Sequence, residues 1–141
     1  MARHEVVSDQ LHDRGPVVRI RLRPCAAARR AMKRQGQKAA SSIQVDALLD
    51  TGSSRSILRE GLMEKLGIYP VGMVKMRTAL KEQVSSHEFL LDVQLGNIKF
   101  GAVFIGAPMP DSDVQALIGR DILAHCKFTY RGKAKKFTLE F

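Results

Sequence analysis

The stretch that decides the fold is residues 47–54, which read Ala-Leu-Leu-Asp-Thr-Gly-Ser-Ser in a chain of 141 residues. Three apolar residues, at the end of a run typical of a β-strand, lead directly to the carboxylate of Asp50. A carboxylate behind an apolar strand is not stable as an isolated anion, because desolvation disfavours its charged form. We therefore expect Asp50 to share a proton or to accept hydrogen bonds. The nearest groups that can donate to it belong to Thr51, Gly52 and Ser53.

Other kinds of site can end a strand in an aspartate, and the surrounding residues argue against three of them. A nucleotide-binding strand is accompanied by a Gly-x-x-x-x-Gly-Lys-[Ser/Thr] loop, which the sequence lacks. A phosphotransferase usually has a second aspartate two positions on, where this chain has Gly52. A metal site needs further ligands, whereas Ser54, Arg55 and Ser56 follow. An ordinary aspartate at a strand end stays open on this motif alone, because short motifs recur by chance.

A second motif stands about seventy residues downstream, where residues 116–123 read Ala-Leu-Ile-Gly-Arg-Asp-Ile-Leu. Here too an apolar strand leads into a polar turn, and a short helix is expected to follow. Together, the two motifs resemble the paired signature of the retropepsins, the retroviral-type aspartic proteases. The resemblance covers roughly residues 43–141, and Val17–Arg23 supplies an earlier strand. Because both motifs occur at the family's spacing in a short chain, they favour a protease site over an ordinary aspartate at a strand end.

The resemblance implies an all-β fold, a small closed retropepsin-like barrel with one or two short helices. It also assigns roles to named residues, without a metal ion or any other cofactor. The catalytic group is Asp50, Thr51 and Gly52, and the turn that supports it is Gly119, Arg120 and Asp121. The substrate-binding residues are Ser53 and Arg55, together with Thr78, Ala79 and Leu80 near the tip of a flap hairpin placed at about residues 76–84.

The resemblance further implies a homodimer that cleaves a peptide or protein substrate. An aspartic protease needs two carboxylates, but this chain has one Asp-Thr-Gly sequence, so Asp50 has to meet its own symmetry mate. Two features differ from the viral pattern. The flap segment contains no glycine, and the usual acidic partner of Arg120 is missing, which leaves Asp121 or Glu60 to pair with it. A catalytically silent dimeric interaction module with the same fold is the alternative.

The positive charge is concentrated at the beginning of the chain. The sequence has 23 basic and 14 acidic residues, a net charge of +9. Residues 1–40 contain ten of the basic residues but only three of the acidic ones. Residues 1–13 are expected to be a flexible tail, and residues 14–141 the protease domain, with a basic insertion at about 26–41. That insertion is interpreted as a solvated loop or marginal surface helix. A nucleic-acid-binding protein is the disfavoured alternative, since few aromatic residues accompany the cations.

The composition and the local sequence patterns give further expectations about the class of protein and its secondary structure. Hydrophobic residues at 45% exclude a wholly disordered chain, and no apolar run is long enough for a membrane span, so no membrane partner is expected. Two cysteines, without metal-ligand spacing, indicate free thiols in a reducing compartment, taken as the cytoplasm. The patterns predict short helices at residues 59–67 and 121–125, and strands at residues 17–23, 43–49, 71–80, 88–95, 99–105, 115–118, 127–130 and 135–141.

Overall fold

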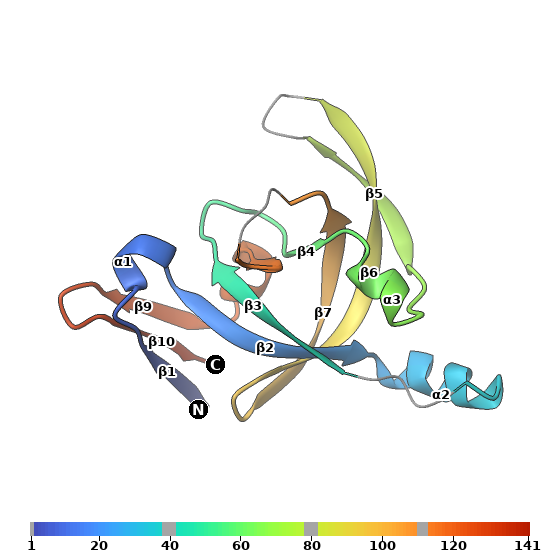
Figure 1. Ribbon diagram of the computed structural model, residues 1–141, viewed down its shortest axis with the longest axis horizontal. Helices are drawn as coiled ribbons and strands as arrows, with labels where there is room; N and C mark the ends of the chain where they lie inside the picture. The colour runs from blue at the N-terminus through green and yellow to red at the C-terminus, as the bar shows by residue number, and fades with distance from the viewer. Residues whose placement is uncertain (1, 38–41, 78–81, 110–112) are drawn as a thin grey trace.

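The structure, a computed structural model, describes residues 2–37, 42–77, 82–109 and 113–141, and it consists mostly of β-strands (Figure 1). The strands are β1 (Arg3–Val7), β2 (Val17–Pro24), β3 (Ile43–Leu49), β4 (Ile57–Arg59), β5 (Gly72–Arg77), β6 (Gln83–Leu95), β7 (Ile98–Ala107), β8 (Ala116–Ile118), β9 (Lys127–Arg131) and β10 (Lys136–Glu140). The helices are α1 (Leu11–Arg14), α2 (Ala26–Arg34), α3 (Leu62–Lys65) and α4 (Arg120–Leu123). None of these described helices is both long and apolar enough to cross a membrane.

Six strands close into a barrel, which confirms the all-β prediction. Around the barrel the order is β2, β3, β8, β4, β7 and β6. The ring closes because β6 pairs back with β2 along Arg21–Pro24, while the first part of β2 pairs with β3. The contacts β3–β8 and β4–β7 are parallel and the others are antiparallel. Strand β5 lies outside the ring and pairs with β6 to form a hairpin that projects from the barrel in Figure 1.

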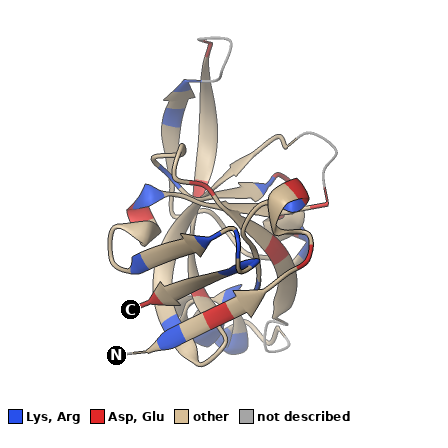
Figure 2. Cartoon of the chain, turned by 90° about the vertical axis from the view of Figure 1, so that its left-hand side faces the viewer, with Lys and Arg blue, Asp and Glu red and all other residues tan. Residues whose placement is uncertain are grey.

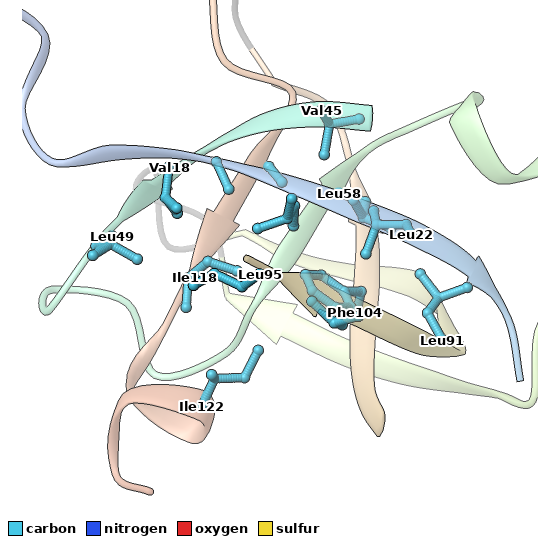
Figure 3. Close-up of a cluster of buried hydrophobic side chains, with 14 of the residues drawn as sticks. Val18, Leu22, Val45, Leu49, Leu58, Leu91, Leu95, Phe104, Ile118 and Ile122 are labelled. Atoms are coloured by element: carbon cyan, nitrogen blue, oxygen red, sulfur yellow. The ribbon is translucent and has the colours of Figure 1, made fainter. Parts of the chain in front are cut away.

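The alternation of apolar and charged residues in β2 places its apolar side chains inside the barrel. Val18, Ile20 and Leu22 are fully buried, and the arginines between them are exposed, as the sequence predicts. The other strands add apolar side chains to the same interior, as the close-up in Figure 3 shows. The labelled members of this core are Val18, Leu22, Val45, Leu49, Leu58, Leu91, Leu95, Phe104, Ile118 and Ile122.

The expectation of a flexible tail over residues 1–13 is wrong. Residues 3–7 form β1, which pairs antiparallel with β10, and β10 pairs with β9 to complete a separate three-stranded sheet. Figure 2 faces the side that carries this sheet and shows charges of both signs on it. Ion pairs join Arg3 to Glu5 and to Glu140, at 3.0 and 3.9 Å. The segment looks polar and frayed in the sequence because its strand partner lies at the other end of the chain.

The helix expected at residues 59–67 is shorter than predicted, and a strand precedes it. Ile57 and Leu58 belong to β4, which pairs with β7 on one side and β8 on the other. Arg59, the first residue of the expected helix, belongs to the same strand and is paired with Ala107, so at this position the tertiary pairing overrides the local helical pattern. The predicted stop at Gly67 is confirmed by its left-handed backbone, with φ of 68°.

The basic segment at residues 26–40 forms a surface helix where it is described. None of the residues of α2 is buried, as its single large apolar side chain, Met32, leads one to expect. Its attachment is polar: Arg29 Nη1 donates to the carbonyl oxygen of Pro24 at 2.6 Å and to Asp92 Oδ2 at 2.8 Å. The helix therefore rests on the barrel through a charged contact rather than through an apolar face.

The N-terminal segment should be part of the folding unit, and Leu11 tests this. Its side chain is 2% exposed in α1, so Leu11→Ala should lower the free energy of unfolding by about 3 kcal/mol through lost burial and a residual cavity. Val7→Ala is the matched control, because Val7 is 69% exposed, and we expect a change within about 0.5 kcal/mol. Urea unfolding of both variants measures the difference. Equal stabilities would mean that the segment does not pack on the core.

Candidate active site

Two parallel strands bring the two sequence motifs side by side. Strand β3 ends at Leu49, which is paired with Ile118 at the end of β8. The next residue continues the pairing, since the Asp50 N–H donates to the carbonyl oxygen of Ile118 at 2.9 Å. Because the strands run in the same direction, the turn after each one emerges at the same end of the barrel. Asp50 and Gly119 are thus neighbours although 69 positions separate them in the sequence.

The Asp50 carboxylate has a backbone donor within its own turn. The Gly52 N–H donates to Asp50 Oδ1 at 2.9 Å, and the Ser53 N–H donates to the Asp50 carbonyl oxygen at 3.2 Å. Asp50 is half-buried, which is less than the apolar strand before it suggests, because Thr51 and Gly52 are both exposed. Among the described residues the carboxylate therefore has a single donor, the Gly52 N–H, and the exposed residues beside it leave its other side open towards the surface.

Gly119 is required by the close approach of two backbone segments. A Cβ at this position would lie 2.5 Å from the carbonyl oxygen of Arg55 and 2.9 Å from that of Ser53. Side-chain contacts at these distances do not occur, so only glycine fits without a backbone shift. The next residue uses the same approach, because the Arg120 N–H donates to the Ser53 carbonyl oxygen at 2.8 Å. This contact fixes the turn after Asp50 against the turn after β8.

A buried serine and the carboxylate of Asp121 join the two turns. Ser56 is completely buried, and both its N–H and its hydroxyl donate to Asp121, at 2.9 and 2.7 Å. The Gly119 N–H in turn donates to Ser56 Oγ at 3.0 Å. The role of Ser56 was missed in the sequence, where it is one of four serines within residues 42–56 and carries no distinguishing signal. Asp121, expected from the sequence as a supporting residue, accepts both of these bonds at the start of α4.

The partner expected for Arg120 is wrong. Arg120 Nη1 donates to the carbonyl oxygen of Thr51 at 2.7 Å, and neither Asp121 nor Glu60 pairs with it among the described residues. Asp121 instead accepts the two bonds from Ser56 and lies 3.8 Å from Arg55 Nε. The reason is geometric, because the Asp121 carboxylate turns inward to satisfy buried donors. Arg120 therefore holds the exposed backbone of the turn that carries Asp50.

The residues expected to contact substrate are brought together only in part. Ser53 lies within the turn, and its hydroxyl donates to the carbonyl oxygen of Arg55 at 2.7 Å. A hairpin formed by β5 and β6, with Met76 opposite Val84, lies where the flap is expected from the sequence. The three flap residues named from the sequence, Thr78, Ala79 and Leu80, lie outside the described residues. No group of three or more His, Cys, Asp or Glu side chains that could hold a metal ion occurs in the part of the chain that the structure describes.

The comparisons with known proteins agree with this geometry. A family model described as aspartyl protease matches residues 38–122, which include both Asp50–Gly52 and Gly119–Asp121. The chain belongs to the aspartyl protease family. No curated protein matches the chain. The family match ends before the strands β9 and β10, so it does not depend on the terminal sheet.

Similar proteins are also found among solved structures. A retropepsin-like aspartic protease from Rickettsia conorii is similar over 99% of this chain and 91% of its own, with 20% identity and a TM-score of 0.51. The simian foamy virus (mac) protease is similar over 57% and 81%, with 15% identity and a TM-score of 0.44. A foamy viral protease-reverse transcriptase is similar over 79% of this chain and 12% of its own, with 14% identity and a TM-score of 0.49. The first of these likenesses confirms the retropepsin-like fold.

Two glycines of this aspartyl protease site should respond differently to the same change. Gly119→Ala forces a backbone shift, and we expect a loss of about 2–3 kcal/mol in the free energy of unfolding. In Gly52→Ala, the contact of the new Cβ among the described residues is the side-chain oxygen of Asp50, at 3.1 Å, which can move aside. Gly52→Ala should therefore fold with nearly unchanged stability. Chemical denaturation of the two variants checks this, and equal losses would contradict the close approach at Gly119.

Proposed function

We propose that the chain is an aspartic endopeptidase that acts as a homodimer, with one Asp50 from each subunit. The observation that carries the proposal is the placement of Asp50 in an aspartyl protease fold, at an open turn whose backbone donates to its carboxylate. One carboxylate cannot serve as both base and acid at the same moment of the reaction. A second copy of the chain supplies the other, and Thr51 and Gly52 are exposed, which leaves that side of the turn accessible to it.

The proposed chemistry follows from two carboxylates that face each other. Like charges a few ångströms apart are costly, so the pair holds one proton between its two members. The ionised member takes a proton from a water molecule, which attacks the scissile carbonyl carbon, and the protonated member hydrogen-bonds to the carbonyl oxygen. The tetrahedral intermediate then breaks down when a proton is delivered to the leaving nitrogen. Two groups within each subunit have positioning roles. The Gly52 N–H positions the Asp50 carboxylate, and Arg120 holds the Thr51 carbonyl oxygen.

Substrate residues are proposed to lie between the turn and the flap hairpin. Gly52 has no side chain, so a substrate backbone can pass close to the carboxylate. Ser53 and Arg55 are proposed to contact the substrate on the turn side. Thr78, Ala79 and Leu80 are proposed to do so from the flap, which would close over the peptide and exclude water.

Asp50→Asn tests the catalytic role directly. The amide retains the shape and an acceptor for the Gly52 N–H but cannot take a proton from water, so peptide cleavage should fall by at least about a thousandfold. Cleavage of a peptide library at acidic and neutral pH gives the measurement, and circular dichroism shows whether the variant is folded. Full activity in Asp50→Asn, or in Asp50→Ala, would end the proposal. A folded wild-type chain that cleaves no peptide at either pH would favour the silent interaction module.

Mixing subunits tests the dimer. If both carboxylates share one site, an excess of Asp50→Asn chain should inhibit a fixed amount of wild-type chain, because the mixed dimer has one ionisable carboxyl group in place of two. Specific activity should also fall when the wild-type chain is diluted below its dimer dissociation constant. An active chain that is monomeric by sedimentation, and is unaffected by the excess variant, would refute the homodimer while leaving hydrolysis itself in place.

A further inference from the structure

Strand β7 has an unpaired edge over residues 99–103. Its other edge pairs with β6 from Leu95 opposite Ile98 to Glu88 opposite Ile105. On the free side, the short strand β4 reaches only from Ile105 to Ala107. Among the described residues, no strand pairs with the earlier part of β7 on this side.

The backbone groups that point out of this edge can be assigned from one printed bond. The Ile105 N–H donates away from β6, to the carbonyl oxygen of Ser56 at 3.0 Å. Backbone groups alternate in direction along an antiparallel strand, so Val103, Gly101 and Lys99 point the same way as Ile105. The two-residue turn at Gly96-Asn97 gives the same assignment of inward and outward backbone groups, because Leu95 and Ile98 close the hairpin as a hydrogen-bonded pair. Three residues thus offer an N–H and a carbonyl oxygen to an incoming strand.

The two faces beside this edge differ in chemistry. On the outer face of the barrel lies a groove of about 520 Å³. Its described lining includes Arg21, Arg23, Arg29 and Lys99 and one carboxylate, Asp92. Arg29 and Asp92 are already paired, at 2.8 Å. Arg21 and Lys99 have no ion-pair partner among the described residues, and the register places them in one row across β2, β6 and β7. This face is therefore positive.

The opposite face is largely apolar. A groove of about 430 Å³ runs beside residues 100–103, between β7 and the C-terminal part of the chain. Its apolar lining includes Ile122 and Phe141, and the ring of Phe141 stacks on Phe100 with centroids 5.4 Å apart. His125 and the Arg55–Asp121 pair lie at the same groove. A strand added to β7 would alternate its side chains between this groove and the positive face.

We propose that the edge of β7 binds an extended segment of another polypeptide, about five residues long, in which acidic and apolar side chains alternate. Its backbone pairs with the outward groups of Lys99, Gly101 and Val103, its acidic residues lie over the positive face, and its apolar residues enter the groove at Phe141. Gly101 suits this role, because it is exposed and a side chain there would contact nothing nearer than 4.0 Å. A glycine within a strand often marks the close approach of another backbone.

The charge and the aromatic packing favour an acidic peptide over other occupants. A second copy of this chain carries a net charge of +9, so its approach to the positive face is disfavoured. A single-stranded nucleic acid needs free aromatic faces for its bases, but Phe100 is already stacked on Phe141. Lys99 lies on β7 itself and contacts the segment directly. Arg21 lies two strands away, about 10 Å, and acts through its field within the Debye length.

The test measures binding to the Asp50→Asn chain, so it does not depend on whether the protein cleaves peptides. The probe is a fluorescein-labelled seven-residue peptide of alternating Glu and Val, compared by anisotropy with a block peptide, Glu residues first and Val residues last. Both have the same composition and charge. We expect the alternating peptide to bind at least about tenfold more tightly, since only its pattern serves both faces. No binding at millimolar concentration, or equal affinities, would overturn the proposal.

Protein variants and modified peptides separate the contribution of charge to binding from that of backbone pairing. Lys99→Glu should weaken binding by about tenfold and Arg21→Glu by about threefold, whereas Lys133→Glu, an equal charge change in the exposed β9–β10 turn, should leave it nearly unchanged. Peptides N-methylated at alternate residues test the strand pairing. One methylation register should abolish binding and the other should not, because only every second amide faces β7. Equal effects of the two registers would overturn the pairing.

The other occupants are distinguishable in the same assay. One such outcome is that an RNA oligonucleotide binds more tightly than the alternating peptide and loses this binding in Lys99→Glu. That result would identify the ligand of this edge as a nucleic acid and overturn the proposal. Peptide affinity that falls as the protein concentration rises would show that a second copy of the chain covers the edge, which also overturns it. Loss of peptidase activity in Asp50→Asn, with binding retained, would support both proposals separately.

Discussion

The active-site region depends on the close approach of Gly119 to the backbone of residues 53–55. No side chain fits between these segments, and the hydrogen bond from the Arg120 N–H to Ser53 closes the contact. Each segment follows one of two parallel strands, so the approach aligns the ends of β3 and β8. Asp50 is the first residue after β3, and its position is therefore fixed by backbone contacts on both sides. The Gly52 N–H bond to Oδ1 then orients the carboxylate of Asp50 within this fixed turn.

Polar groups, rather than apolar packing, hold together the two turns behind Asp50. Ser56 and Asp121 satisfy one another through two hydrogen bonds, and Ser56 also accepts from Gly119. Burying such groups is costly unless every donor and acceptor is paired, so the arrangement tolerates few alternatives. It therefore specifies a single path for the chain through the turn. The apolar core of the barrel, by contrast, begins with Leu49, Leu58 and Ile118 and supplies the bulk of the buried surface.

The parts of the fold that the sequence predicts are those encoded locally. The alternation in β2, the Asp50 turn and the Gly119 turn each occupy a few consecutive residues, and each is found where expected. The misses share a non-local cause. Strand β1 is recognisable only with its partner β10, which lies about 130 residues away, and β4 exists because two distant strands flank it. The partners of Arg120 and Ser56 likewise depend on how two turns face each other, which no short pattern contains.

The same constraint that fixes the active-site turn also shapes the edge of β7. Residues 53–56 are held against Gly119 and Asp121, so β4 cannot begin before Ile57. Strand β4 is then only three residues long, and it meets β7 at Ile105–Ala107. The preceding part of β7 is left without a neighbour, because the chain that could have covered it is engaged in the turn beside Asp50. A closed barrel normally removes its sheet edges, and here the closure is incomplete at β7, whose partner β4 is shortened by the active-site turn.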